Sequence, residues 1–169
     1  IPNCENSIYK QGIKTVLIYR KGWELSFPII NLDSKEQIEL IFDELGNKAG
    51  EYSWSLIHCN MIWEKDDLEP IQYISGQESG DISEISFSQN TMVNYINYKL
   101  NLPNKNCKIT KSGNYLIQIH ERNNHEQVVL TQRFFVIEAQ TEISAHIDQL
   151  KTKIKDGLNQ RLNIEINYN

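Results

Sequence analysis

The stretch that decides the fold class is Tyr95–Leu102, which is YINYKLNL and is followed by Pro103. From Ile96 onward every second residue is apolar, and the residues between are asparagine or lysine. This alternation is typical of a β-strand with one buried face, and a proline ends such a strand. The residues expected on the buried face are Ile96, Tyr98, Leu100 and Leu102.

Short stretches of the same kind recur along the chain. Residues 37–42 alternate in the same way, whereas residues 51–63 are apolar on both faces, as in a central strand covered from two sides. Pro28 marks an edge strand or a bulge within residues 24–32. The expected strands are residues 13–20, 24–32, 37–42, 51–63, 82–87, 95–102, 115–121 and 128–138.

The segments between these strands carry turn signals and no helical pattern, apart from a single helical turn expected near residues 68–73. The composition agrees, because the chain has only three alanines and is rich in isoleucine and asparagine. The sequence therefore predicts an all-β fold, an immunoglobulin-like antiparallel β-sandwich with a long acidic loop at residues 64–81 and a C-terminal extension.

The domain organisation follows from a change of pattern near residue 139. Residues 1–139 form the expected sandwich, and residues 140–169 form the extension. The two ends of the extension alternate as strands do, whereas Leu150, Ile154 and Leu158 recur at helical spacing. The extension is either a final hairpin or the first strands of a following β-sandwich domain, and we favour the second interpretation.

Length and charge limit the class of protein. The chain has 169 residues and a formal net charge of −5, so it lacks the basic surface that nucleic acid requires. Its longest apolar stretches, residues 16–19 and 134–137, are far too short to span a membrane. No signal peptide is visible, and the start at Ile1 without a methionine indicates a processed or cut chain.

No group of residues predicts catalysis, a cofactor or a metal. His58 and Cys59 are neighbours in a predicted strand and so point to opposite faces. The acidic residues 64–69 lack the order of a calcium loop, and His120 and His125 have no third ligand at metal-binding spacing. We therefore expect no catalytic, cofactor-binding or metal-binding residues, no cofactor and no enzyme activity.

The three cysteines leave the redox chemistry open. Cys59 lies in an apolar stretch and is expected to be a buried free thiol. A bridge between Cys4 and Cys107 would be chemically possible in an oxidising compartment, but the spacing does not select a pairing.

The large aromatic residues also allow two interpretations. Most of them are expected in the core, but a row on an exposed face would bind a sugar or a protein. The residues concerned are Trp54, Trp63, Tyr73, Tyr95 and Tyr98.

Several longer strings carry a resemblance to a known family. They are KTVL at residues 14–17, LSFPII at 25–30, SLIHCNMIW at 55–63, SFSQNT at 86–91, YINYKLNL at 95–102, KITKSGNYL at 108–116 and LTQRFFVIE at 130–138. In this order, over residues 13–138, the chain resembles the first domain of the type 9 secretion system plug protein. The resemblance is weaker at residues 43–50, DELGNKAG, where the family carries an acidic loop.

The resemblance implies a protein that works by obstruction. Family members are periplasmic, lie at the inner face of the outer membrane, and bind the outer-membrane translocon barrel protein of type 9 secretion to close its periplasmic opening. It also implies an amino-terminal fragment. We further expect a monomer with no membrane span of its own. Residues 64–81 and 122–126 are the candidate contact loops, because loops carry recognition on β scaffolds. The alternative is a carbohydrate- or protein-binding β-sandwich module of a secreted or cell-surface protein.

Overall fold

The computed structural model describes residues 4–122, 124–138, 141–149 and 160–168. It divides into two compact units, Ile1–Ile137 and Glu138–Asn169. The expected helical spacing at Leu150, Ile154 and Leu158 lies outside the described residues.

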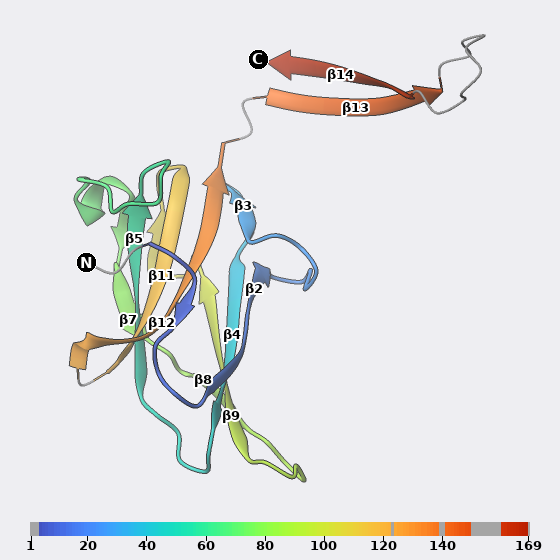
Figure 1. Cartoon of the computed structure of the whole chain (residues 1–169). Coiled ribbons are helices and arrows are strands. Elements are labelled where there is room, and N and C mark those ends of the chain that lie inside the picture. The colour runs from blue at the N-terminus through green and yellow to red at the C-terminus, as the bar shows by residue number, and fades with distance from the viewer. Residues whose placement is uncertain (1–3, 123, 139–140, 150–159, 169) are drawn as a thin grey trace. The chain divides into compact units, whose positions relative to one another are not determined.

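The regular elements of the first unit are strands of two to 14 residues and, among its described residues, a single 3₁₀ turn (Figure 1). In chain order they are β1 (Ser7–Ile8), β2 (Ile13–Arg20), β3 (Ile29–Asn31), β4 (Ile38–Leu45), β5 (Tyr52–Cys59), η1 (Pro70–Gln72), β6 (Ile74–Gly76), β7 (Ser79–Asp81), β8 (Glu84–Phe87), β9 (Tyr95–Leu102), β10 (Cys107–Ile109), β11 (Gly113–Glu121) and β12 (Asn124–Ile137).

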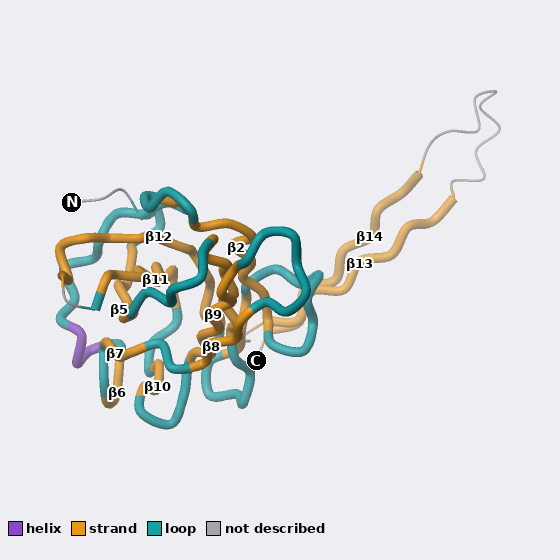
Figure 2. Tube along the Cα trace, turned by 90° about the horizontal axis from the view of Figure 1, so that it is seen from below, coloured by secondary structure: helices purple, strands orange, loops and turns teal. Residues whose placement is uncertain are grey.

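Two sheets form the layers of the sandwich. One has the strand order β1-β12-β11-β5-β7, and the other has the order β2-β4-β9-β8. Figure 2 shows β5, β11 and β12 on one side and β2, β8 and β9 on the other. The pairings are antiparallel except that β3 runs parallel to β12, and β6 pairs with β10 as a small separate ribbon. The predicted all-β sandwich is therefore confirmed.

The alternating stretch that decided the fold class forms β9, with the predicted bounds and the predicted buried face. Tyr98 is fully buried and stacks on Phe42 of β4 with 4.9 Å between the ring centroids. Across the sandwich, Tyr115 of β11 stacks on Phe134 of β12 in the same way. One apolar cluster contains residues of both sheets, so burial of these alternating faces holds the layers together.

A buried ionic group reinforces this core. The Glu44 carboxylate of β4 accepts hydrogen bonds from Lys10 Nζ at 2.9 Å, the Tyr52 hydroxyl at 2.7 Å and the Tyr98 hydroxyl at 2.9 Å. The backbone N–H of Gly50 donates a fourth, at 3.1 Å. Because Tyr52 belongs to β5, these bonds join the two sheets.

Three predicted strands are shorter in the structure, and the one expected over residues 82–87 begins only at Glu84, as β8. The strand expected over residues 51–63 ends at Cys59, because the Asn60 side chain accepts hydrogen bonds from the N–H groups of Ile62 and Glu64 and closes a turn. The strand expected over residues 24–32 is reduced to β3, which begins just after Pro28.

The two predicted loops are partly strands. Residues 64–81 contain the expected turn, as η1, but also β6 and β7, which pair with β10 and β5. The hairpin loop expected at residues 122–126 is shorter, since β12 already begins at Asn124.

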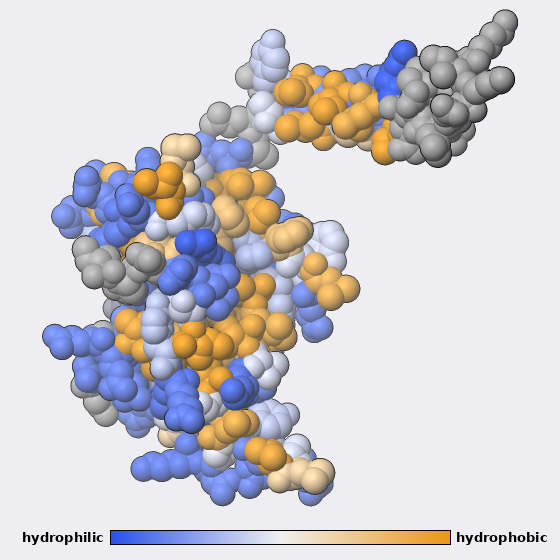
Figure 3. Space-filling model, in the orientation of Figure 1, coloured by the Kyte–Doolittle hydropathy of each residue, from blue (hydrophilic) through white to orange (hydrophobic). Residues whose placement is uncertain are grey.

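The second unit is an antiparallel hairpin of β13 (Thr141–Gln149) and β14 (Gln160–Tyr168). Its strands pair Ile143 with Ile166, Ala145 with Ile164, and Ile147 with Leu162, so these side chains share one face. The isoleucines and the leucine among them are 56–65% exposed. Figure 3 shows apolar atoms along this hairpin. In the part of the chain that the structure describes, no helix has the length and apolar character needed to cross a membrane.

Candidate interaction surface

The turn after β5 and the first half of the predicted acidic loop together form the tip segment, which we define as residues 60–72. Met61, Ile62 and Ile71 are 88%, 67% and 85% exposed, and acidic residues lie between them in the sequence. Large apolar side chains in a polar surround are typical of surfaces that bind other proteins. Figure 3 shows small apolar areas separated by hydrophilic ones on the visible face of the first unit.

The tip segment is attached to β5. The Asp66 N–H donates to the His58 carbonyl at 3.0 Å, and the Asp66 carboxylate lies 3.1 Å from His58 Nδ1. His58 itself is buried, with its ring edge-on to Tyr115. At the far end, Glu69 and Gln72 cap the 3₁₀ turn. These bonds fix the backbone of the tip segment at two points, which lowers the entropy cost of ordering it when a partner binds.

Beside the tip segment, a hollow of about 660 Å³ lies over β5 and β11. Its lining includes Ser55, Ile57, Gln118 and His120 from these strands. Ser55 Oγ lies 3.0 Å from His120 Nε2 and links the two strands. The acidic residues of the lining are Asp66, Asp67, Glu69 and Glu78. These carboxylates suit a partner with basic groups, by charge complementarity.

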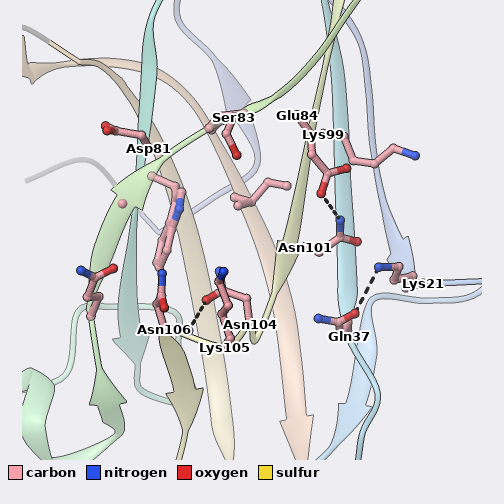
Figure 4. A pocket seen from close by; sticks show the side chains of 15 residues that line it. Lys21, Gln37, Asp81, Ser83, Glu84, Lys99, Asn101, Asn104, Lys105 and Asn106 are labelled. Atoms are coloured by element: carbon pink, nitrogen blue, oxygen red, sulfur yellow. Dashed lines mark hydrogen bonds between the residues drawn. The ribbon is translucent and has the colours of Figure 1, made fainter.

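A second hollow, of about 490 Å³, lies at the edge of the sandwich between β7 and β9 (Figure 4). Two pairs of its polar side chains are hydrogen-bonded to each other, whereas the buried Asn101 Oδ1 has no hydrogen-bond partner among the described residues. The Asn101 amide donates to Glu84 at 3.3 Å, and Lys21 donates to Gln37 at 3.2 Å. We interpret this hollow as a polar edge of the sandwich and not as a candidate binding site.

The second predicted contact loop meets the end of the first. Arg122, at the hairpin, lies 3.0 Å from the Asp81 carboxylate and 3.7 Å from that of Glu51. All three side chains are at least half exposed, so the ion pairs contribute little to stability. The side chain of His125 lies outside the described residues.

The residues singled out from the sequence are distributed as follows. His58 and Cys59 do point to opposite faces, since His58 packs on Tyr115 of the main core and Cys59 belongs to a separate cluster. That cluster contains Cys4, whereas Cys107 lies in the main core. The fold therefore places Cys4 near Cys59 and not near Cys107. Among the described residues, no group of three or more His, Cys, Asp and Glu side chains is arranged to hold a metal ion.

The aromatic residues are core residues for the most part. Trp54, Tyr73 and Tyr98 are at most 3% exposed. Trp63 is covered by the Arg133 guanidinium, which lies 4.3 Å from its ring, and by the ring of Phe135. These residues do not form an exposed aromatic row. Met61 and Ile62 lie on the surface although their apolar pattern predicts a strand, and the signal that indicates the turn is Asn60 before them.

The fold is a β-sandwich whose loops expose apolar side chains beside acidic ones, a pattern typical of protein-binding domains. The family described as type 9 secretion system plug protein 1st domain matches residues 13–138, and the chain belongs to this family.

A solved structure supports the fold. The chain is similar to a hypothetical protein from Parabacteroides merdae, with 32% sequence identity and a TM-score of 0.83 over 96% of this chain. The chain spans 41% of the length of that protein. A second match is a Pseudomonas fluorescens alkylpurine DNA glycosylase, AlkC, bound to DNA containing an abasic site analog. Its sequence identity is 8% and its TM-score is 0.39, over 73% of this chain and 29% of that one, so this match does not show a shared fold. No curated protein matches the chain.

Proposed function

We propose that this chain is the first domain of a non-enzymatic plug that binds the outer-membrane translocon barrel of type 9 secretion and closes its periplasmic opening. The family match over residues 13–138 is the observation that carries the proposal. The proposed place of action is the periplasm, at the inner face of the outer membrane.

Two features of the structure support obstruction as the mechanism. The first is stiffness, since two sheets packed face to face resist deformation by a passing chain. The second is the tip segment, whose exposed apolar side chains stand beside acidic ones. A contact of this mixed character is strong enough to hold and weak enough to release, unlike a large apolar interface.

The experiment tests the tip segment as the contact. In the full-length protein, Met61→Ser with Ile62→Ser removes two exposed apolar side chains without touching the core. The matched control is Met92→Ser with Val93→Ser, which are 105% and 61% exposed on another loop. Each protein is tagged and used to recover the barrel from outer-membrane extracts. We expect the tip variant to lower the affinity about tenfold, a loss of roughly 1.4 kcal/mol, and the control to bind normally.

The possible outcomes distinguish a wrong contact segment from a wrong function. If both variants recover the barrel as well as the unmodified protein does, the tip segment is not the contact, and deletion of residues 122–126 tests the other candidate loop. If the unmodified protein recovers no barrel at all, the plug function itself is wrong.

We also propose that Glu138–Asn169 is the start of a following β-sandwich domain. Its hairpin exposes a continuous apolar face, and an isolated two-stranded hairpin is marginally stable at best. The length of the Parabacteroides merdae protein supports this proposal, since further chain is available there to cover such a face.

A further inference from the structure

Two cysteines that are far apart in the sequence meet on the outer face of the β1-β12-β11-β5-β7 sheet. Cys4 and Cys59 are 3% and 2% exposed and form a small cluster with Leu116 of β11, separate from the main core. Burial and the neighbouring Cys4 thiol both raise the pKa of the Cys59 thiol, which agrees with their place in one cluster. Cys107, the third cysteine, is buried elsewhere, on β10.

Cys4 is held in this place by the N-terminal segment, residues 4–8. Figure 1 shows the segment crossing the face of the sheet to reach β1 beside β12. The Thr131 hydroxyl donates to the Glu5 carbonyl at 2.6 Å, and the Arg133 N–H donates to the Asn6 side chain at 2.7 Å. The Arg133 guanidinium also donates to the Cys4 carbonyl.

These bonds fix the N-terminal segment to β12, while the contact between the cysteines reaches across to β5. Leu116 lies between, because it pairs with Arg133 on one side and with Ile57 on the other. A covalent bond between the sulfurs would therefore fasten the N-terminal segment across the strands β12, β11 and β5.

We propose that Cys4 and Cys59 form a disulfide that fastens the N-terminal segment to the sheet. The thiols lose two protons and two electrons, and a sulfur–sulfur bond forms. A disulfide-bearing oxidant accepts the electrons, its own sulfur–sulfur bond breaks, and it leaves as two thiols. The proposal rests on the envelope location within the proposed function, because disulfides persist in oxidising compartments, but not on binding to the barrel.

The burial of the pair indicates when the bond forms. Burial raises the pKa of the Cys59 thiol, so little thiolate is present once the fold is complete, and thiolate is the reactive form. The oxidant therefore reacts during folding, before the N-terminal segment covers Cys59. The same burial protects the finished bond from reduction, as expected of a structural disulfide.

The test compares the full-length protein exported to an oxidising periplasm with the same protein after reduction. Both are denatured, alkylated and digested with trypsin, and the peptides are identified by mass. We expect the peptide that contains Cys4 and ends at Lys10 to be linked to residues 49–65, with the free thiol on residues 106–108. The ring spanning residues 4–59 is long, so we expect reduction to lower Tm by about 10 °C.

Variants make the result independent of folding defects. Cys4→Ala should lower Tm to that of the reduced protein and leave Cys59 free to react with an alkylating agent after denaturation. Cys107→Ala, the matched control at another buried cysteine, should keep the linked peptide and the Tm change on reduction. Cys59→Ala should give the same result as Cys4→Ala, and if it does not fold, the Cys4→Ala variant is sufficient for the test.

Two results would overturn the proposal. One is that all three cysteines are free thiols in the exported protein and stay free after the protein is refolded with oxidised glutathione. The other is a link that involves Cys107. A failure to bind the barrel would bear on the proposed function only, since the peptide map does not depend on it.

Discussion

Replacement of Glu44 by glutamine tests whether the buried ionic group holds the two sheets together. Glu44 is 9% exposed and accepts four hydrogen bonds, from Lys10, Tyr52, Tyr98 and Gly50. Glutamine has nearly the same shape, but one carboxylate oxygen becomes an amide that cannot accept. Two donors that faced that oxygen therefore lose their acceptor, and the negative charge opposite Lys10 is lost.

The magnitude follows from these two lost bonds. A hydrogen bond to a charged group contributes roughly 1.5–3 kcal/mol. Lys10 retains a second carboxylate partner, Glu121 at 3.2 Å, and the Tyr98 hydroxyl also lies 3.2 Å from the Gly50 carbonyl, so part of the loss is recovered. We expect Glu44→Gln to lower the free energy of unfolding by about 3 kcal/mol, which corresponds to a Tm lower by about 10 °C.

The assay is urea unfolding followed by tryptophan fluorescence, with Tm from calorimetry. Asp43→Asn is the matched control, since it makes the same chemical change one residue earlier, where Asp43 accepts a single hydrogen bond from Asn97 at 2.8 Å. It should cost less than about 1 kcal/mol. If Glu44→Gln lowers the free energy of unfolding no more than Asp43→Asn does, Glu44 does not hold the two sheets together.

Further predictions concern pH, a glycine and the hairpin. Burial alone would raise the pKa of Glu44, but hydrogen bonds from Tyr52, Lys10 and Tyr98 outweigh it and lower the pKa below 4.5. The stabilisation from ionised Glu44 is therefore present above pH 4.5 and is lost as the pH falls through the pKa of the folded state. Tm measured over a pH series should fall in acid for this reason, and it should fall less in Glu44→Gln. Gly113→Ala should lower the free energy of unfolding by about 3 kcal/mol, because φ is +144° at this residue and the added methyl group meets the His58 side chain. Gly46→Ala is the control, since φ is +137° there but the space around it is open. In the same urea assay it should lower the free energy of unfolding by about 1 kcal/mol. Amides of β13 and β14 should exchange quickly in this chain and slowly in the full-length protein; fast exchange in both would contradict the proposed second domain.

The sequence predicts most reliably the strands whose two faces differ. β9 was correctly bounded because Ile96, Tyr98, Leu100 and Leu102 alternate with polar residues, and only one register buries them. β4 extends past the predicted alternation to Leu45, since Glu44 is buried through its partners and not through its own apolarity. Tertiary hydrogen bonds of this kind have no local signal in the sequence.

The candidate surface was predicted only in part. The acidic stretch was expected as a loop, but β6 and β7 were not, because each has three residues and depends on pairing with distant strands. The contact between Cys4 and Cys59 also had no signal, since it follows from where β12 places the N-terminal segment. The exposed Met61 and Ile62 were recoverable in principle, from the turn-forming Asn60 before them.

The most direct test of the plug function is the ion conductance of the purified translocon barrel in a planar bilayer, measured before and after the full-length protein is added on the periplasmic side. We expect the conductance to fall in a saturable way, and the Met61→Ser, Ile62→Ser variant to require a higher concentration for the same effect. Unchanged conductance at saturating protein, with a barrel that is shown to be open, would contradict it.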